Sequence, residues 1–211
     1  MLPTTLGGSK KGRAMTDSAS RQMLLTNQRF DADAALAAIL LIVNRCSSTT
    51  KHRTFKLLYL AEKLHLERYG YLIVGDDYYA MTYGPVPSRI YDAIKFAAGH
   101  CLCLSLDEDL KEGFGSCLKV HGHHLTARCE PDLGSLSESD VSCILETIND
   151  YGEKSLGRLA KLSHDQAWYR ARNGGNPSCL MDFGEIVGTL PNAEEIFEHL
   201  SNPYLVVHGN S

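Results

Sequence analysis

The chain has 211 residues, 44% of them hydrophobic, and its 25 acidic against 21 basic side chains give a formal net charge of −4. Residues 1–30 hold five basic residues and one acidic residue, which leaves 16 basic and 24 acidic residues for the remainder. No basic stripe follows residue 30, so this acidic body disfavours a nucleic-acid partner and favours a basic protein partner.

The longest apolar run covers residues 34–43, only half of the roughly 20 residues that a membrane-spanning helix needs. No signal-peptide pattern stands at the N-terminus. The seven cysteines are an odd number without the spacing of a disulfide scaffold. We therefore expect a cytoplasmic protein with reduced thiols and no membrane partner.

Two regions differ in composition. Residues 1–28 are rich in Gly, Ser, Thr and Lys and lack a hydrophobic period, which predicts a disordered basic extension. Residues 29–211 are predicted to form a single domain.

The first predicted elements are two helices. One covers about residues 31–44, with Asp31 or Asp33 as its N-cap and an apolar middle that predicts burial on several sides. The second covers about residues 51–69, begins after Thr50 and ends at Gly70. Its middle is hydrophobic on every face, so we expect it to be the central helix of the domain.

Strand signals follow the second helix. Residues 71–74 and 78–81 have high β-propensity on either side of a turn-forming cluster, which predicts a short hairpin. The next segment, Gly-Pro-Val-Pro at 84–87, is predicted to be a stiff connector, because each proline restricts its own φ and the residue before it. A third helix is expected from Pro87 or Ser88 to about residue 98, with Gly99 as its stop.

The middle of the chain suggests more strands. Leucines alternate with other residues over 102–106, which predicts a strand, and a loop is expected over 107–116. Residues 118–120 and 125–127 are candidate strands around Gly122. Together these segments are expected to complete a small antiparallel sheet.

The C-terminal part is predicted to be helical. A fourth helix spans about residues 138–151, followed by short helices over 155–162 and 163–172 and a last helix over 192–200. Ser163 and Gln166 have the spacing of a capping box for the second short helix. The whole order predicts an α+β fold, a mostly helical single domain with a small antiparallel sheet or hairpin inserted between helices.

One stretch carries a family resemblance. Residues 56–61 of the second helix read Lys-Leu-Leu-Tyr-Leu-Ala, and residues 75–91 read Gly-Asp-x-Tyr-x-Ala-x-x-Tyr-Gly-Pro-Val-Pro-Ser-x-x-Tyr. This pattern resembles the Panacea, or SocA-like, antitoxin domain, which is also described for phage-associated proteins. The resemblance covers about residues 30–175, and the positions that carry it are Lys56, Tyr59, Gly75, Gly84, Pro85, Pro87, Tyr91, His164 and Trp168.

The resemblance implies an antitoxin of a prokaryotic toxin–antitoxin pair. Members of the family neutralise small protein toxins by forming a complex, and one lineage is an adaptor that delivers its toxin to an AAA+ protease. This sequence departs from the family pattern in its basic extension, and in Ala167, which stands where a proline often precedes the tryptophan.

The residues around the motif are candidates for partner binding. Tyrosine offers a large contact area at low side-chain entropy, and five tyrosines lie close together, at positions 71, 78, 79, 83 and 91. They are either contacts or packing groups between a hairpin and the central helix. Tyr78 and Tyr83 are the best contact candidates. Asp76 and Asp77 would meet a basic toxin or merely form a turn, and Arg89 would be a rim contact or a solvated charge.

Other chemistry is disfavoured. Cysteines 101, 103, 117 and 129 and histidines 121, 123 and 124 are possible zinc ligands, but no Cys-x-x-Cys spacing is present. Phosphate-binding glycine loops, a nucleophile elbow and a His-Glu-x-x-His motif are absent from the sequence. His164 and Asp165 are adjacent, and neighbouring helix residues point about 100° apart, which does not suit an acid–base pair. We expect no enzyme, metal or cofactor.

Three functions stay open at this point. The first is neutralisation of a cognate protein toxin by direct binding. The second is delivery of that toxin to an AAA+ protease. The third is DNA binding through the basic extension.

Overall fold

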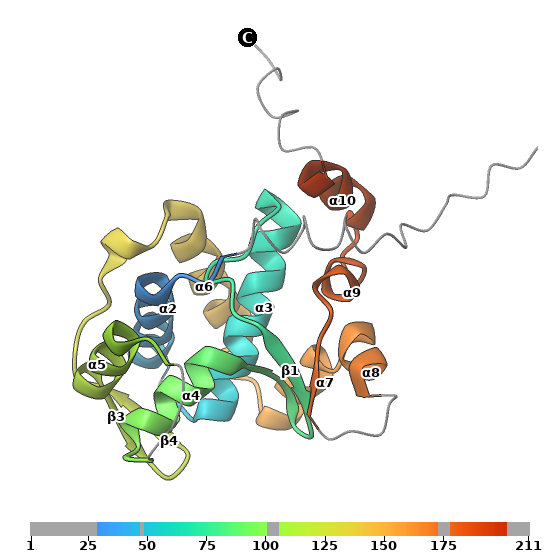
Figure 1. Ribbon diagram of the computed structural model, residues 1–211. Coiled ribbons are helices and arrows are strands. Elements are labelled where there is room, and N and C mark those ends of the chain that lie inside the picture. Colours follow the sequence, from blue (N-terminus) through green and yellow to red (C-terminus); the bar gives the residue numbers. More distant parts are fainter. Residues whose placement is uncertain (1–28, 47–48, 101–105, 173–177, 202–211) are drawn as a thin grey trace, which may run out of the picture.

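The computed structural model describes residues 29–46, 49–100, 106–172 and 178–201. Within these residues the fold is α+β and mostly helical, as predicted, with short antiparallel strands between the helices (Figure 1). The predicted disordered extension, residues 1–28, lies outside the described residues. No helix among the described residues is long and apolar enough to cross a membrane.

Helix α3 (Lys51–Tyr69) runs through the middle of the molecule. It contacts α2 (Ala32–Arg45) and α6 (Glu138–Tyr151), and these three helices match their predicted ranges to within a residue or two. The predicted caps are confirmed where the side chains of Asp31 and Thr50 accept hydrogen bonds from the first turns of α2 and α3. The expectation of a central second helix is therefore confirmed.

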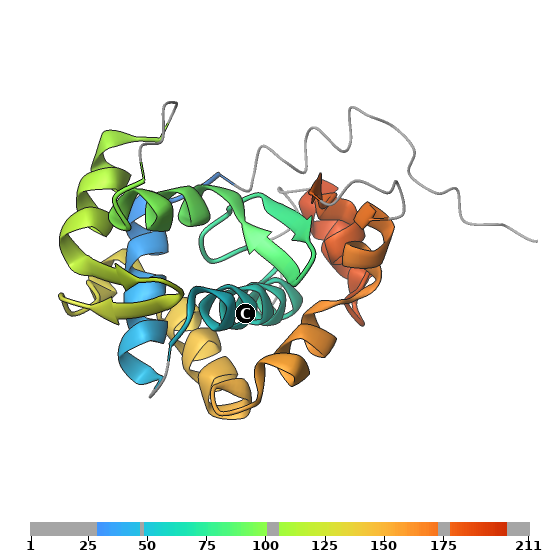
Figure 2. The same ribbon diagram turned by 90° about the horizontal axis from the view of Figure 1, so that it is seen from below.

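Two hydrophobic clusters lie against different faces of α3. The larger cluster includes Phe55, Leu57 and Leu58 and packs with α2 and α6. The smaller cluster includes Tyr59 and Leu66 and packs with the C-terminal helices. In Figure 2, which looks nearly along α3, the two groups of elements lie on opposite sides of this helix. An all-round apolar middle suits this position, because residues 54–59 of the helix are all buried.

The hairpin is displaced from its predicted position by one element. Strand β1 (Tyr78–Met81) pairs with β2 (Gly84–Pro87), so the predicted connector is itself a strand. The order β2-β1-β5, with β5 (Cys179–Leu180), leaves β2 at the edge of the sheet. Two prolines are acceptable there because an edge strand need not donate every amide.

Residues 71–74, predicted to be a strand, do not form one. The amides of Ile73 and Val74 donate to the buried carboxylate of Glu62, at 2.5 and 3.2 Å, and the Val74 carbonyl accepts from Asp31. These backbone groups are thus bound by a side chain and a helix end, and they are not available for a strand ladder. Ile73 and Val74, which contribute to the β-propensity of the segment, are buried without forming a strand.

The predicted loop at 107–116 is instead helix α5 (Glu108–Cys117), which follows α4 (Ser88–Ala97). Asp107 caps α5, and Leu110 and Phe114, one helical turn apart, are buried. The prediction of a loop failed because the segment contains two glycines and a serine, and its apolar face consists of only two residues, too few to give a clear helical period. The predicted strand at 102–106 falls largely outside the described residues. The candidate strands around Gly122 are confirmed as β3 (Leu118–His121) and β4 (His124–Ala127), but they pair in a sheet of their own and do not complete a sheet with the other strands.

A disulfide joins Cys117 and Cys129. These cysteines bracket the β3–β4 hairpin, whose antiparallel register places the two strand ends side by side. The expectation of reduced thiols is wrong for this pair, because the sequence spacing of 12 residues conceals their proximity. Cysteine usage therefore gives no support to a cytoplasmic location.

The C-terminal part holds η1 (Leu133–Ser135), α7 (Leu156–Ser163), α8 (Gln166–Arg172), α9 (Phe183–Val187) and α10 (Ala193–Ser201). The predicted capping box of Ser163 and Gln166 is wrong. Asp165 accepts from the Trp168 amide at 3.1 Å, while the Ser163 hydroxyl donates back to Ala160 within α7. An aspartate nearer the helix start outcompetes the serine.

Candidate functional site: the tip of the β1–β2 hairpin

Three side chains from separate elements hold the tip of the β1–β2 hairpin. Trp168 Nε1 donates to the Met81 carbonyl at 3.0 Å, and Lys56 Nζ donates to the Pro85 carbonyl at 2.8 Å. The His164 ring lies beside the backbone of Tyr83 between them. Because Met81 and Pro85, on either side of Tyr83, are bound in this way, the backbone at the tip is fixed.

The side chains that hold the tip are themselves held in place. His164 stacks on Trp168 with parallel rings 3.8 Å apart, and the Arg172 guanidinium lies 5.1 Å from the indole. Asp165 accepts from Tyr59 at 2.8 Å and from Lys63 at 2.7 Å, so it ties the start of α8 to α3. The supporting groups thus come from α3, the α7–α8 junction and α8.

Gly84 allows the close approach of Lys56. Its φ is +105°, and a Cβ atom at this position would lie 2.7 Å from Cε and 2.8 Å from Nζ of Lys56. Residues that carry a Cβ atom rarely adopt such a φ, and a Cβ atom is essentially never found so close to another heavy atom. The glycine is therefore required by both its backbone conformation and its neighbour.

A pocket of about 310 Å³ opens beside the tip. Lys56 lines it together with His52, Tyr83, Leu156, Gly157 and Ala160. The Tyr83 side chain is 70% exposed and Leu156 is 42% exposed, whereas Lys56 is only 2% exposed. We call this set of six residues the hairpin-tip surface: apolar walls and an exposed tyrosine around a buried amine.

Burial disfavours the charged forms of the basic side chains at the hairpin-tip surface. It lowers the pKa of Lys56 to about 7. Burial also lowers the pKa of His52, with further lowering from His123, Lys56 and Lys51. The pKa of His164 is lowered first by burial and then by Lys56. These basic side chains therefore carry less charge than they would in water.

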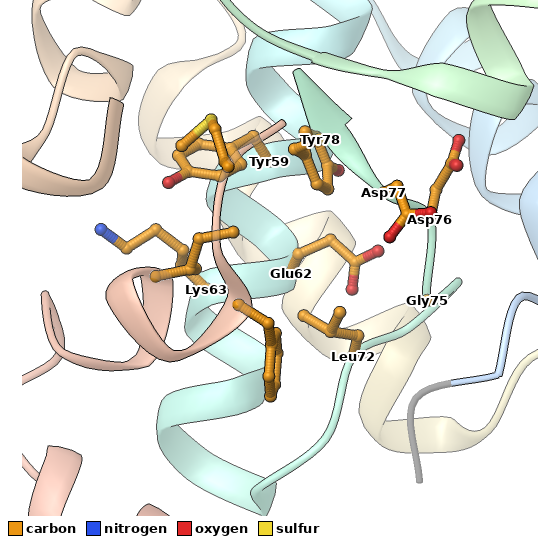
Figure 3. A pocket seen from close by; sticks show the side chains of 11 residues that line it. Tyr59, Glu62, Lys63, Leu72, Gly75, Asp76, Asp77 and Tyr78 are labelled. Carbon is orange, nitrogen blue, oxygen red and sulfur yellow. The ribbon is translucent and has the colours of Figure 1, made fainter. Parts of the chain in front are cut away.

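A second, smaller pocket of about 40 Å³ lies beside the other end of the hairpin (Figure 3). The Glu62 carboxylate points toward the segment that carries Leu72 and Gly75, while Lys63 points away from it. Asp76 accepts from the amides of Arg89 and Ile90, at 3.1 and 3.0 Å, and so holds the first turn of α4. Both carboxylates are thus occupied by backbone amides.

Burial controls the ionisation of this acid pair. Desolvation raises the pKa of Glu62 to about 8 and that of Asp76 to about 6, although hydrogen bonds from backbone amides act in the opposite direction. Burial also raises the pKa of the Tyr78 hydroxyl, with a smaller effect from these two carboxylates. The arrangement anchors residues 73–77 and α4 to α3, which is a supporting role.

The five predicted partner-binding residues are divided by the structure. Asp76 is 4% exposed and Tyr78 is 3% exposed, so their side chains lie inside the protein. Tyr83, Asp77 and Arg89 are exposed. Tyr83 lies at the hairpin tip, whereas Asp77 and Arg89 flank the opposite end, where Tyr78 pairs with Pro87. Arg89 also covers the Phe30 ring at 4.9 Å.

The remaining motif positions have structural surroundings. Pro87 precedes α4 as its N-cap residue, and Gly75 has a φ of 64° at the turn before β1. Tyr91 packs edge-on against Phe55, with ring centroids 5.8 Å apart. Most of the motif thus forms the hairpin and its supports.

Sequence reasoning missed four residues of the hairpin-tip surface: His52, Leu156, Gly157 and Ala160. A signal for the site was present in Lys56, because a lysine that adjoins an all-round apolar helix segment is expected to be buried. The same argument applies to Glu62. No sequence signal links α7 to this site, because the contact depends on how the chain returns to α3.

No group of three or more His, Cys, Asp or Glu side chains is placed to hold a metal ion among the described residues. Cys117 and Cys129, two of the possible zinc ligands, are bonded to each other. Cys101 and Cys103 fall outside the described residues.

A family model described as antitoxin SocA-like, Panacea domain, matches residues 55–169. This match covers more than half of the chain, and it includes the hairpin and all three side chains that hold its tip. The chain belongs to the SocA-like antitoxin family. The predicted resemblance is therefore confirmed. No match was found among curated proteins or among solved structures.

Membership of this SocA-like family indicates an antitoxin role. An antitoxin is a regulatory protein that acts on another protein, and catalysis is not required for it. Within the matched range the structure places one exposed tyrosine on a fixed hairpin beside a pocket.

We predict that Glu62→Gln changes the pH dependence of stability. The pKa of Glu62 rises from its ordinary 4.5 to about 8 on folding. Its protonated form therefore stabilises the fold fully below about pH 4.5, and this contribution is lost as the pH rises through 8. The free energy of unfolding of the wild type, minus that of the variant, should fall by about 3 kcal/mol between pH 5 and 8 in urea titrations.

Glu146→Gln is the matched control for this experiment. Glu146 is an exposed partner of Arg68, and the Arg68 side chain lowers its pKa. The stability that Glu146 contributes is therefore present above its ordinary pKa and is lost in acid, the opposite direction. Equal slopes for the two variants would contradict the assignment of Glu62.

We also predict that Gly84→Ala lowers the free energy of unfolding by about 2–3 kcal/mol, because the new Cβ meets Lys56 at a φ of +105°. Gly157→Ala is the control, since nothing lies within 4 Å of its Cβ and it is helical. That change should raise stability by about 0.5–1 kcal/mol. Thermal unfolding measures both, and equal midpoints would show that Gly84 is not constrained.

Proposed function

We propose that this protein neutralises a cognate protein toxin by binding it directly, with the hairpin-tip surface as the centre of the contact. The observation that supports this is the exposed Tyr83 on a backbone fixed by Lys56, His164 and Trp168. These supporting residues lie within the range of the antitoxin family match.

A fixed tyrosine is suited to protein binding. Association costs free energy when loops and side chains become ordered, and a hairpin that is already held reduces this cost. Binding energy also concentrates in a few residues, often tyrosines, that lie beside a pocket. Tyr83 and the neighbouring Leu156 together provide exposed apolar area next to such a pocket.

The other predicted contact residues lie away from the centre of the proposed interface. Asp77 and Arg89, at the far end of the hairpin, are proposed as outlying contacts. Asp76 and Tyr78 support the hairpin from inside. We propose no catalytic role and no cofactor, and the action on the toxin is placed in the cytoplasm.

Delivery of the toxin to an AAA+ protease and DNA binding through residues 1–28 are the alternatives. The adaptor function predicts that the toxin disappears in cells that hold the protease and persists when the protease is deleted. The DNA-binding function predicts that DNA affinity is lost when residues 1–28 are removed. Direct neutralisation predicts neither effect.

We predict that Tyr83→Ala weakens binding of the toxin about 10- to 100-fold, because it removes the exposed anchor of the hairpin-tip surface. The toxin to use is the product of the gene next to this one, purified in an inactive form. Isothermal titration gives the affinity, and co-expression of the active toxin gives growth rescue. The thermal midpoint should stay within about 2 °C of wild type, since Tyr83 is an exposed surface residue.

Tyr69→Ala is the control, because this tyrosine is 44% exposed but lies at the opposite end of α3. It should bind and rescue as the wild type does. A wild-type chain that forms no complex and gives no rescue would refute direct neutralisation. Equal affinity for Tyr83→Ala and wild type would move the contact away from the hairpin tip.

A further inference from the structure

We propose that the pocket of the hairpin-tip surface receives an acidic side chain of the toxin, whose carboxylate binds Lys56 while an adjoining apolar residue covers Leu156 and Tyr83. The inference rests on the proposed function, because the occupant is a residue of the toxin. It adds the chemical identity of the contact, which neither the family match nor the motif provides.

Lys56 supplies the donor. Its ammonium has three N–H groups, and the Pro85 carbonyl at 2.8 Å accepts one of them. Among the described residues no carboxylate lies within ion-pairing distance of it. Lys56 is 2% exposed and lines a pocket of about 310 Å³, and its amine makes no hydrogen bond among the described residues other than the one to Pro85.

His52 adds a polar ring to the same pocket. The ring packs edge-on against Tyr83, with centroids 5.8 Å apart, and lies 5.3 Å from His123. Two basic side chains thus line one apolar pocket, and Lys56 is the one that has N–H groups left for an acceptor oxygen of the occupant.

The basic side chains around the pocket favour an acidic occupant. His123, Lys56 and Lys51 all lower the pKa of His52. Asp165, the acidic residue at the α7–α8 junction, is occupied by Lys63 and Tyr59. A carboxylate favours the charged form of Lys56 that burial disfavours, and it gains a charge-assisted hydrogen bond that a neutral carbonyl does not.

The apolar walls select a protein side chain over nucleic acid. Gly157, Ala160 and Leu156 line the pocket together with Lys56, whose side chain is nearly inaccessible to solvent. Phosphate backbones are bound mainly by exposed lysines and arginines, which reach outward. A carboxylate at the end of a short side chain, beside an apolar residue, reaches a recessed amine between apolar walls.

The test measures binding of the full chain to the purified product of the neighbouring gene. Lys56→Met removes the amine and keeps the length of the side chain, and we expect at least a 30-fold loss of affinity. Gly157→Trp fills the pocket and leaves Lys56 and the hairpin untouched, because nothing lies within 4 Å of its Cβ. We expect a loss of similar size. If Lys56→Met fails to fold, Gly157→Trp still tests the role of the pocket.

Two controls match these variants. Lys95→Met removes a lysine from α4 that pairs with Asp92, outside the pocket. Leu133→Trp adds an indole at a 48% exposed position of η1. Both should bind the toxin within about twofold of wild type.

A double-mutant cycle identifies the occupant. Each surface Asp and Glu of the toxin is changed to Asn or Gln and titrated against wild type and Lys56→Met. We expect one acidic residue whose substitution weakens binding to wild type at least 10-fold and has no further effect on binding to Lys56→Met.

The outcomes separate the two proposals. If the wild type binds the toxin and Tyr83→Ala weakens the complex, but Lys56→Met and Gly157→Trp bind normally, the pocket inference is wrong and direct neutralisation stands. Fully additive cycles for every acidic residue also overturn it. Absence of any complex overturns both proposals. A labelled 20-nucleotide single strand whose binding depends on Lys56 would assign the pocket to nucleic acid instead.

Discussion

The buried ammonium of Lys56 and its hydrogen bond to the Pro85 carbonyl are the interaction on which the rest of the site depends. Burial of an amine is unfavourable unless it is hydrogen-bonded, and here burial lowers the pKa of Lys56 to about 7. One donor fixes the edge strand of the hairpin, and Gly84 is required so that the lysine can reach it. The Pro85 carbonyl, the conformation of Gly84 and the lining of the pocket thus all involve this one amine.

Helix α3 carries a second buried ionisable group, Glu62, which holds the chain at the other end of the hairpin. Lys56 binds a carbonyl of the tip, and Glu62 binds two amides of the segment that leads into the hairpin. Asp76 then anchors the helix that follows. Side chains thus replace a longer strand ladder, which explains how so short a hairpin is held in one position.

The distribution of charge distinguishes the site from the rest of the molecule. The chain as a whole is acidic, yet the side chains that lower the pKa of His52, which are His123, Lys56 and Lys51, are all basic. Net charge describes long-range behaviour such as solubility and steering, whereas a pocket responds to the few charges within reach of it. The prediction of a basic partner rests on overall charge, whereas at the hairpin-tip surface we propose an acidic contact.

The sequence alone determined the helices with a strong period, α2, α3 and α6, the β3–β4 hairpin, and the motif that identifies the family. Local spacing suffices for these, because the periodicity and the capping residues lie within each segment. Only the tertiary structure decided that residues 71–74 form no strand, that Asp76 and Tyr78 are buried, and that Leu156 lies beside Tyr83. Each of these depends on contacts between residues far apart in the chain, such as Glu62 with Ile73 or His164 with the hairpin, and no local pattern contains that information.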